Sequence, residues 1–192
     1  MVKEKTNILG EIGAGDAFEI LMTLAKEDKH IRKRIEQIAK ERLSRVDLED
    51  VASDVYLALN DIEVEDLWQQ SGSTRYGYVE PTERAYEMFG EELEPFMEEL
   101  KKYQKLSMNK EAKTYCMGIL KGIYQFEKES TTEFADWAVD DPKEYFESVL
   151  DKWGKETKDQ KDMTDIEDFI KKNMPDWYKR VSKKFEKSNP ST

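Results

Sequence analysis

The sequence predicts an all-α fold, and three observations support that prediction. Hydrophobic residues recur at helical spacing along most of the 192-residue chain, with no alternating strand pattern and no Asn-Gly hairpin signal. Only 9 Gly and 5 Pro occur, whereas Glu, Lys, Leu and Met are frequent, as in helical proteins. Aspartates able to cap helix N-termini precede several of the hydrophobic stretches.

Two helices are expected before residue 45. The first begins at Asp16, an N-cap residue with Glu19 three positions later, which is close to a capping box. The second follows the polar residues 26–28 and runs to about Leu43. Their apolar stripes consist of Ala17, Ile20, Leu21 and Leu24, and of Ile31, Ile35 and Ile38. Because only a few polar residues join the two helices, we expect an antiparallel hairpin over residues 16–43.

A third helix should begin near Asp47, since Asp50 follows three positions later. Its inward-facing residues are Val51, Val55 and Leu59. Residues 65–70 are expected to form a short turn. Residues 71–79 contain two glycines and two tyrosines, and this composition predicts an ordered loop.

The fourth helix should start near Pro81, where the missing N–H costs nothing. Pro95 lies inside the same amphipathic pattern. A proline within a helix removes a hydrogen bond and clashes with the preceding turn, so we expect a kink or a break near residues 91–94.

The fifth helix, about Asn109 to Lys128, is the most apolar one. Gly118 and Gly122 are one turn apart in it, which favours the close approach of another helix. The next helix should be capped by Asp141, with Pro142 as its first residue and Gly154 at its end. After a charged connection at residues 155–162, two further helices are expected on either side of Pro175.

Successive helix pairs spaced by about 30–47 residues fit either a superhelical stack of αα repeats or an irregular helical bundle. Both architectures remain open at this point. We expect one helical domain over residues 1–186, followed by a flexible tail at residues 187–192.

The stretch GDAFEILMTLAKEDKHIRKRIEQIAKERL, residues 15–43, resembles the opening helical hairpin of HEAT-like α-solenoids. It is also similar to helical regions that accompany SWIM-type zinc fingers in bacterial proteins. The zinc finger itself requires several cysteines and a histidine, whereas this chain has one of each. The resemblance implies a helical binding surface and transfers no catalytic residue.

The charge of the chain is −11, and it is unevenly distributed. Residues 46–100 hold 2 basic and 16 acidic side chains. This favours a basic protein partner and disfavours nucleic acid, although the acids could equally form solvated helix exteriors. No apolar stretch is long enough for a membrane span, and the N-terminus lacks a signal-peptide pattern, so we expect a cytoplasmic protein.

Few residues have the chemistry of a metal or catalytic site. The pairs Glu83/Glu87 and Glu94/Glu98 share helix faces, but the single His30 gives only one Glu-x-x-His motif. We therefore predict no metal and no cofactor. Cys116 lies on an apolar helix face and is interpreted as a structural thiol.

The best candidate binding residues surround the loop at residues 71–79. They are Trp68, Arg75, Tyr76, Tyr78 and Arg84, which are types that dominate the energetics of interfaces. These residues could line a ligand or peptide groove. Alternatively, Trp68 and one tyrosine attach the loop to the core while the arginines pair with local acids.

The sequence thus predicts a non-enzymatic helical scaffold or protein-interaction module. Two alternatives remain. One is a nucleic-acid-associated accessory module that uses the basic run at residues 29–34. The other is an enzyme that uses carboxylates or tyrosine between helices, which a carboxylate of raised pKa beside a deep pocket would favour.

Overall fold

A computed structural model describes residues 8–75, 77–157 and 159–186, and α-helix dominates it, which confirms the predicted fold class. Contacts divide the chain into two units, residues 1–45 and residues 46–192, where one domain over residues 1–186 was expected. The predicted tail at residues 187–192 lies outside the described part of the chain.

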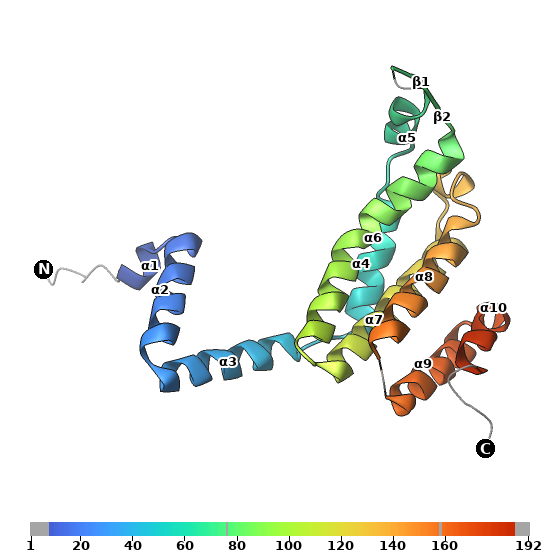
Figure 1. The fold of residues 1–192 in the computed structure, drawn as a ribbon. Helices are drawn as coiled ribbons and strands as arrows, with labels where there is room; N and C mark the ends of the chain where they lie inside the picture. The colour runs from blue at the N-terminus through green and yellow to red at the C-terminus, as the bar shows by residue number, and fades with distance from the viewer. Residues whose placement is uncertain (1–7, 76, 158, 187–192) are drawn as a thin grey trace, which may run out of the picture. The chain divides into compact units, whose positions relative to one another are not determined.

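The first unit contains α1 (Ile8–Glu11), α2 (Ala14–Glu27) and α3 (Lys29–Leu43). Asp28 alone separates α2 from α3, and its carboxylate accepts hydrogen bonds from the backbone N–H groups of His30 (2.6 Å) and Ile31 (3.2 Å). The two helices meet at a corner (Figure 1), rather than in the antiparallel hairpin that residues 16–43 predict. The reason is the one-residue connection, since helices that pack side by side in bundles are joined by two residues or more.

The N-terminus of α2 also differs from the prediction. The helix begins at Ala14 with Gly13 as its N-cap, so Asp16 lies in the first turn and does not cap it. An acid in that turn still interacts favourably with the helix dipole. Neither α2 nor α3 buries a side chain.

The second unit follows the order α4 (Leu48–Asn60), α5 (Val64–Gln70), β1 (Gly72–Thr74), β2 (Gly77–Val79), α6 (Pro81–Lys105), α7 (Asn109–Glu129), the 3-10 helix η1 (Glu133–Asp136), α8 (Asp141–Glu156), α9 (Gln160–Asn173) and α10 (Pro175–Glu186). The predicted cap at Asp47 is confirmed, because its carboxylate accepts from the N–H of Glu49 at 2.8 Å and of Asp50 at 3.2 Å.

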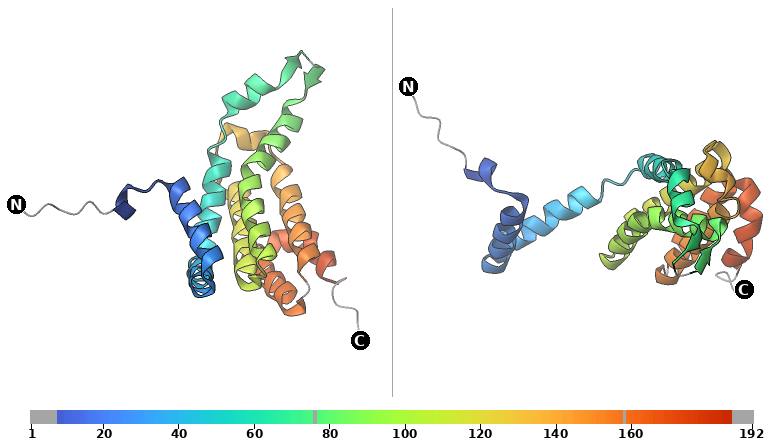
Figure 2. Two further views of the ribbon diagram at one scale, coloured as in Figure 1. Left: turned by 60° about the vertical axis from the view of Figure 1, so that its left-hand side comes forward. Right: turned by 90° about the horizontal axis from the view of Figure 1, so that it is seen from above.

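The second unit is an irregular helical bundle. Helix α7 packs against α4, α6, α8 and α9, so it lies at the centre of the core, and Figure 2 shows α4, α6, α7 and α8 running side by side. The largest fully buried side chains of this core are Trp153, Phe89, Phe126, Phe134 and Phe146.

The two glycines of α7 allow the close approach that their spacing predicts. A Cβ at Gly118 would lie 2.6 Å from the Cβ of Val51, and one at Gly122 would lie 2.6 Å from the carbonyl oxygen of Ala52. Both contacts are with α4, so the backbones of α4 and α7 lie close together at these two glycines.

Helix α6 is continuous from Pro81 to Lys105, so the chain does not break near residues 91–94. Pro95 is exposed, whereas Leu93, Met97 and Leu100 of the same helix are buried. Burial of this apolar face holds the helix together and outweighs the single backbone hydrogen bond that the proline removes.

Helix α8 is displaced from its predicted limits by one residue at its start and by two at its end. Asp140 is the N-cap and Asp141 is the first helical residue. The helix continues through Gly154 to Glu156, since the backbone of Gly154 does not adopt the left-handed conformation that terminates helices.

The expected loop at residues 71–79 contains a two-stranded antiparallel hairpin. Gly72 pairs with Val79, and Ser73 pairs with Tyr78. Gly72 and Gly77 have φ angles of 83° and 133°, a region that favours glycine. The strands have three residues each, too short for an alternating pattern to reveal them. Across the described residues, no helix is both long and apolar enough to cross a bilayer.

Candidate functional site

A groove of about 510 Å³ runs between α6 and α8. Its floor is apolar, because the buried side chains of Leu93, Met97 and Val149 form it together with Gly90. The rim is polar and consists of Glu87, Glu91, Glu94, Glu98, Lys101, Tyr145, Ser148 and Lys152. An apolar floor within a polar rim is the usual construction of a binding site for another molecule.

The α6 wall of the groove is a line of four glutamates, Glu87, Glu91, Glu94 and Glu98. Their spacing of four, three and four residues places them on one face of the helix. The buried residues Leu93 and Met97 lie beside this line and turn toward the core. The amphipathic pattern of α6 therefore sets the acidic wall and the apolar floor next to each other.

Basic residues hold three of these carboxylates in position. Arg84 pairs with Glu87 at 2.8 Å and with both oxygens of Glu91 at 2.8 and 2.9 Å. The hydrogen bond from Arg84 lowers the pKa of Glu91, so that carboxylate stays ionised. Lys101 pairs with Glu98 at 2.5 Å, and this hydrogen bond lowers the pKa of Glu98. Glu94 has no ion pair within the described residues.

Tyr145 of α8 closes one end of the groove. Its hydroxyl donates to the carbonyl oxygen of Tyr86 at 3.0 Å, and its ring stacks on Phe89 at 5.2 Å between ring centroids. Burial raises the pKa of Tyr145, so the hydroxyl remains a donor. A Cβ at Gly90 would lie 2.9 Å from the Cζ of Tyr145, so the glycine provides the space for this ring.

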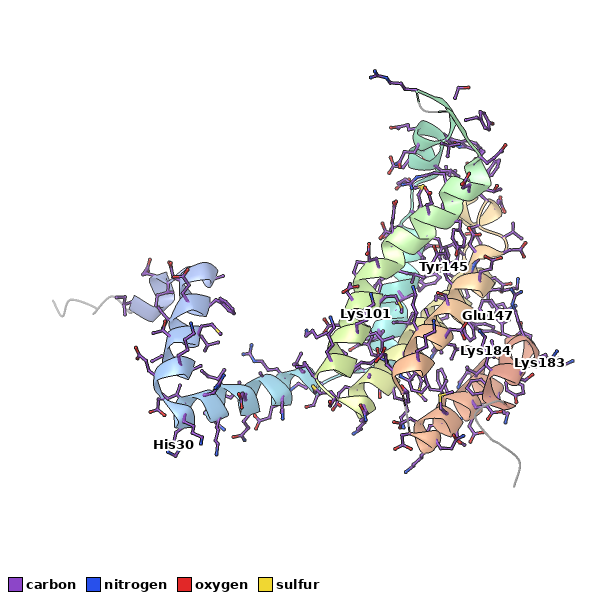
Figure 3. The ribbon with its side chains drawn as sticks, viewed as in Figure 1. His30, Lys101, Tyr145, Glu147, Lys183 and Lys184 are labelled. Atoms are coloured by element: carbon purple, nitrogen blue, oxygen red, sulfur yellow. The ribbon has the colours of Figure 1, made fainter. Side chains whose placement is uncertain are left out.

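The other end of the groove is rich in lysine. A second hollow of about 370 Å³ shares Met97, Lys101 and Lys152 with the first and extends to Lys105 and Lys155. Figure 3 labels Lys101 on α6 and Tyr145 on α8, the two helices that line the groove. The charge of the rim therefore changes along the groove. Acidic residues lie toward Tyr145, and lysines lie toward the C-terminal ends of both helices.

The opposite edge of α8 is already occupied by α10. Glu147 forms an ion pair with Arg180 and lies 3.6 Å from Lys184, which also pairs with Asp151 at 2.7 Å. Figure 3 shows Glu147 on the side of α8 that faces α10. These acids serve the packing of α10, whereas Tyr145 and Lys152 face the groove.

The binding residues predicted from the sequence lie in α5, around the hairpin and in the first turn of α6. Trp68 is 44% exposed and packs edge-to-face on Trp137, with ring centroids 4.7 Å apart. Arg84 donates to Gln70 at 3.0 Å as well as to Glu87 and Glu91, so it ties α5 to α6, in line with the alternative of arginines paired to local acids. Arg75 and Tyr78 are exposed around the hairpin, and Tyr76 lies outside the described residues.

The sequence did not predict this groove, since the glutamate pairs of α6 were considered there only as possible metal ligands. Glu94 and Glu98 stood out as a pair on one helix face, and the longer line from Glu87 to Glu98 is visible in the same pattern. Ser148 and Lys152 were not singled out, because nothing in a single sequence indicates that α8 packs beside α6. Only the tertiary structure shows that α8 forms the second wall of the groove.

Other residues with potential chemistry lie elsewhere. Cys116 is fully buried, and burial raises the pKa of its thiol, consistent with a structural role. Burial raises the pKa of Asp141 to about 6, with repulsion by Glu144 and Asp140 as further causes, yet Asp141 does not line the groove. No group of three or more potential metal-ligating side chains converges within the described ranges.

Comparison of the chain with protein families, with characterised proteins and with solved structures gave no match.

Proposed function

We propose that the chain is a non-enzymatic helical interaction module whose second unit binds a basic segment of a protein partner in the groove between α6 and α8. The observation that carries this proposal is the line of Glu87, Glu91, Glu94 and Glu98 directly beside the apolar floor of the groove. The line lies in the part of the chain, residues 46–100, that holds 16 acidic and 2 basic side chains.

The geometry suits a segment that combines Lys or Arg with one or two apolar side chains. An apolar side chain would cover Leu93, Met97 and Val149, and a cation would reach the carboxylate of Glu94. Arg84 and Lys101 already hold the neighbouring carboxylates, so little side-chain entropy is lost on binding. A complementary charge on the partner would raise the association rate and fix its direction.

The hairpin offers a second contact for the same partner. Arg84 links the groove to α5, where Trp68 lies, and the exposed Arg75 and Tyr78 follow in the hairpin. These aromatic and arginine side chains, with Tyr76, are the residue types that supply most of the energy of interfaces. We place the protein in the cytoplasm, since one cysteine cannot build a disulfide framework.

The test compares two exposed glutamates of α6, neither of which has an ion pair among the described residues. Glu94 lines the groove, whereas Glu92 does not. The full chain is used to capture partners from a lysate of the source organism, as wild type, as Glu94→Lys and as Glu92→Lys. Mass spectrometry identifies the captured partners. The segment in contact is then mapped by cross-linking from a cysteine at Ser148, in a chain that carries Cys116→Ser.

We expect a partner that wild type and Glu92→Lys retain equally and that Glu94→Lys binds at least about tenfold more weakly. The cross-linked segment should carry Lys or Arg beside apolar residues. The proposal fails if Glu94→Lys captures every partner as well as Glu92→Lys does. It also fails if the cross-linked segment is acidic.

A further inference from the structure

Helices α2 and α3 leave an apolar surface uncovered by their own unit. The exposed fractions are 63% for Phe18, 45% for Ile20, 41% for Leu21, 43% for Met22, 39% for Leu24, 37% for Ile31 and 41% for Ile38. Soluble monomers rarely expose apolar patches larger than a few hundred Å² unless the patch binds something. Helices of 14 and 15 residues also gain most of their stability from packing rather than from intrinsic propensity.

The two helices cannot cover each other because of the corner at Asp28. The apolar arc of α2 is broad: Phe18, Leu21, Met22 and Leu24 are spaced by one to three residues. The stripe of α3 is narrow and consists of Ile31, Ile35 and Ile38. With a single residue between them, the two helices form separate arms of a corner (Figure 1), and each arm carries one of these surfaces.

The arms carry opposite charge. Helix α2 has three acidic residues and one basic residue, and α3 has six basic and two acidic residues. No ion pair joins α2 to α3 within residues 8–45, where Arg32 pairs with Glu36 inside α3. Among residues 8–45, the acids of α2 therefore have no ion-pair partner.

We infer that the first unit is a self-association surface, in which α2 of one copy packs along α3 of a second copy. A two-fold axis makes this contact twice, so that each apolar arc covers the other copy's isoleucine stripe. With 14 and 15 residues, the two helices are about 21 and about 22 Å long, so they are nearly equal in length. The charges fit as well: Asp16 and Glu19 border the arc of α2, and Arg32, Arg34 and Arg42 lie three or four residues from an isoleucine of α3.

The inference is tested by charge exchange in the full chain. Variant A carries Asp16→Lys and Glu19→Lys, which makes both of its helices basic. Variant B carries Arg32→Glu, Arg34→Glu and Arg42→Glu, which makes both of its helices acidic. Sedimentation velocity measures the mass of each protein alone and of an equal mixture of the two, at low ionic strength. All 4 tryptophans lie in residues 46–192, so near-ultraviolet circular dichroism checks independently that the second unit is folded.

We expect wild type to form dimers at about 100 μM and each variant alone to dissociate at least about tenfold more readily. The mixture of A and B should recover the dimer, because every α2–α3 contact in the mixed pair joins opposite charges. Wild type that stays monomeric at this concentration overturns the inference, and so does a mixture as weak as its components. Binding of monomeric wild type to vesicles of anionic lipid, or docking of the first unit onto its own second unit, also overturns it.

Discussion

Gly122 of α7 lies directly against the carbonyl oxygen of Ala52 in α4, so closely that a Cβ on the glycine would be 2.6 Å from that oxygen. The same Cβ would lie 2.6 Å from the Cβ of Val55. A backbone carbonyl inside a helix cannot turn aside as a flexible side chain can. The separation of α4 and α7, and with it the centre of the bundle, therefore depends on the absence of a side chain at this position.

Gly122→Ala should lower the free energy of unfolding by about 3 kcal/mol, because the added methyl group pushes the two helices apart. Gly154→Ala is the matched control in α8, since its Cβ would meet only Met163 Cε at 4.0 Å. Alanine at that position should stabilise the protein by about 0.5–1 kcal/mol through helix propensity. Urea denaturation measures the free energy of unfolding of both variants. Equal changes in the two would contradict the close packing of α4 against α7 at Gly122.

Pro95→Ala should stabilise the second unit by about 2 kcal/mol. The substitution restores an N–H that can donate to the carbonyl of Glu91 in the continuous helix α6. Pro95 is exposed, so little packing is lost with its ring. Thermal unfolding followed by circular dichroism at 222 nm tests this, and a lower melting temperature would mean that the proline supports the helix.

Arg84→Gln should destabilise the second unit by about 1 kcal/mol. The substitution removes the ion pairs with Glu87 and Glu91, and the side chain of Arg84 is only 14% exposed. Arg75→Gln is the control, because Arg75 is exposed near the hairpin, and its effect should stay within about 0.5 kcal/mol. Comparing the two variants by urea denaturation separates an arginine that ties α5 to α6 from one that is available to a partner.

Asp141 should make the second unit less stable as the pH rises from about 4 to about 6. Its pKa is about 6 in the folded chain, above the ordinary value of 3.8, so the folded state binds more protons in this window. Asp141→Asn removes this dependence. The stability of wild type relative to the variant should fall by about 1 kcal/mol between pH 4 and pH 7, a moderate amount because this carboxylate is only partly buried and water screens part of its charge.

Denaturation curves for wild type and Asp141→Asn at several pH values provide the measurement. A difference between the two proteins that does not change with pH would show that Asp141 titrates normally. A difference that grows in favour of wild type above pH 6 would mean that the ionised carboxylate is stabilising.

Local patterns in the sequence were sufficient for the fold class and for several details of the second unit. The 3.6-residue periodicity predicted its longer helices, and Asp47 caps α4 as expected from its position. Residues 65–70, expected as a turn, belong instead to the short helix α5. The spacing of Gly118 and Gly122 predicted a close helix contact, since only glycine leaves space for a neighbouring backbone. These features depend on neighbouring residues in the chain, and a single sequence contains that information.

The tertiary structure alone decided which helices are neighbours. Pro95 remains inside a continuous helix because buried residues on the same face outweigh one lost hydrogen bond. The spacing of the glutamates from Glu87 to Glu98 is visible in the sequence. They line a groove only because α8 places Tyr145, Ser148 and Lys152 opposite them. The apolar stripes of α2 and α3 predicted a hairpin, and the single residue Asp28 sets them at a corner with both surfaces uncovered. An amphipathic pattern indicates that one face of a helix is buried. Which element buries that face depends on the lengths of the connections and on packing between distant parts of the chain.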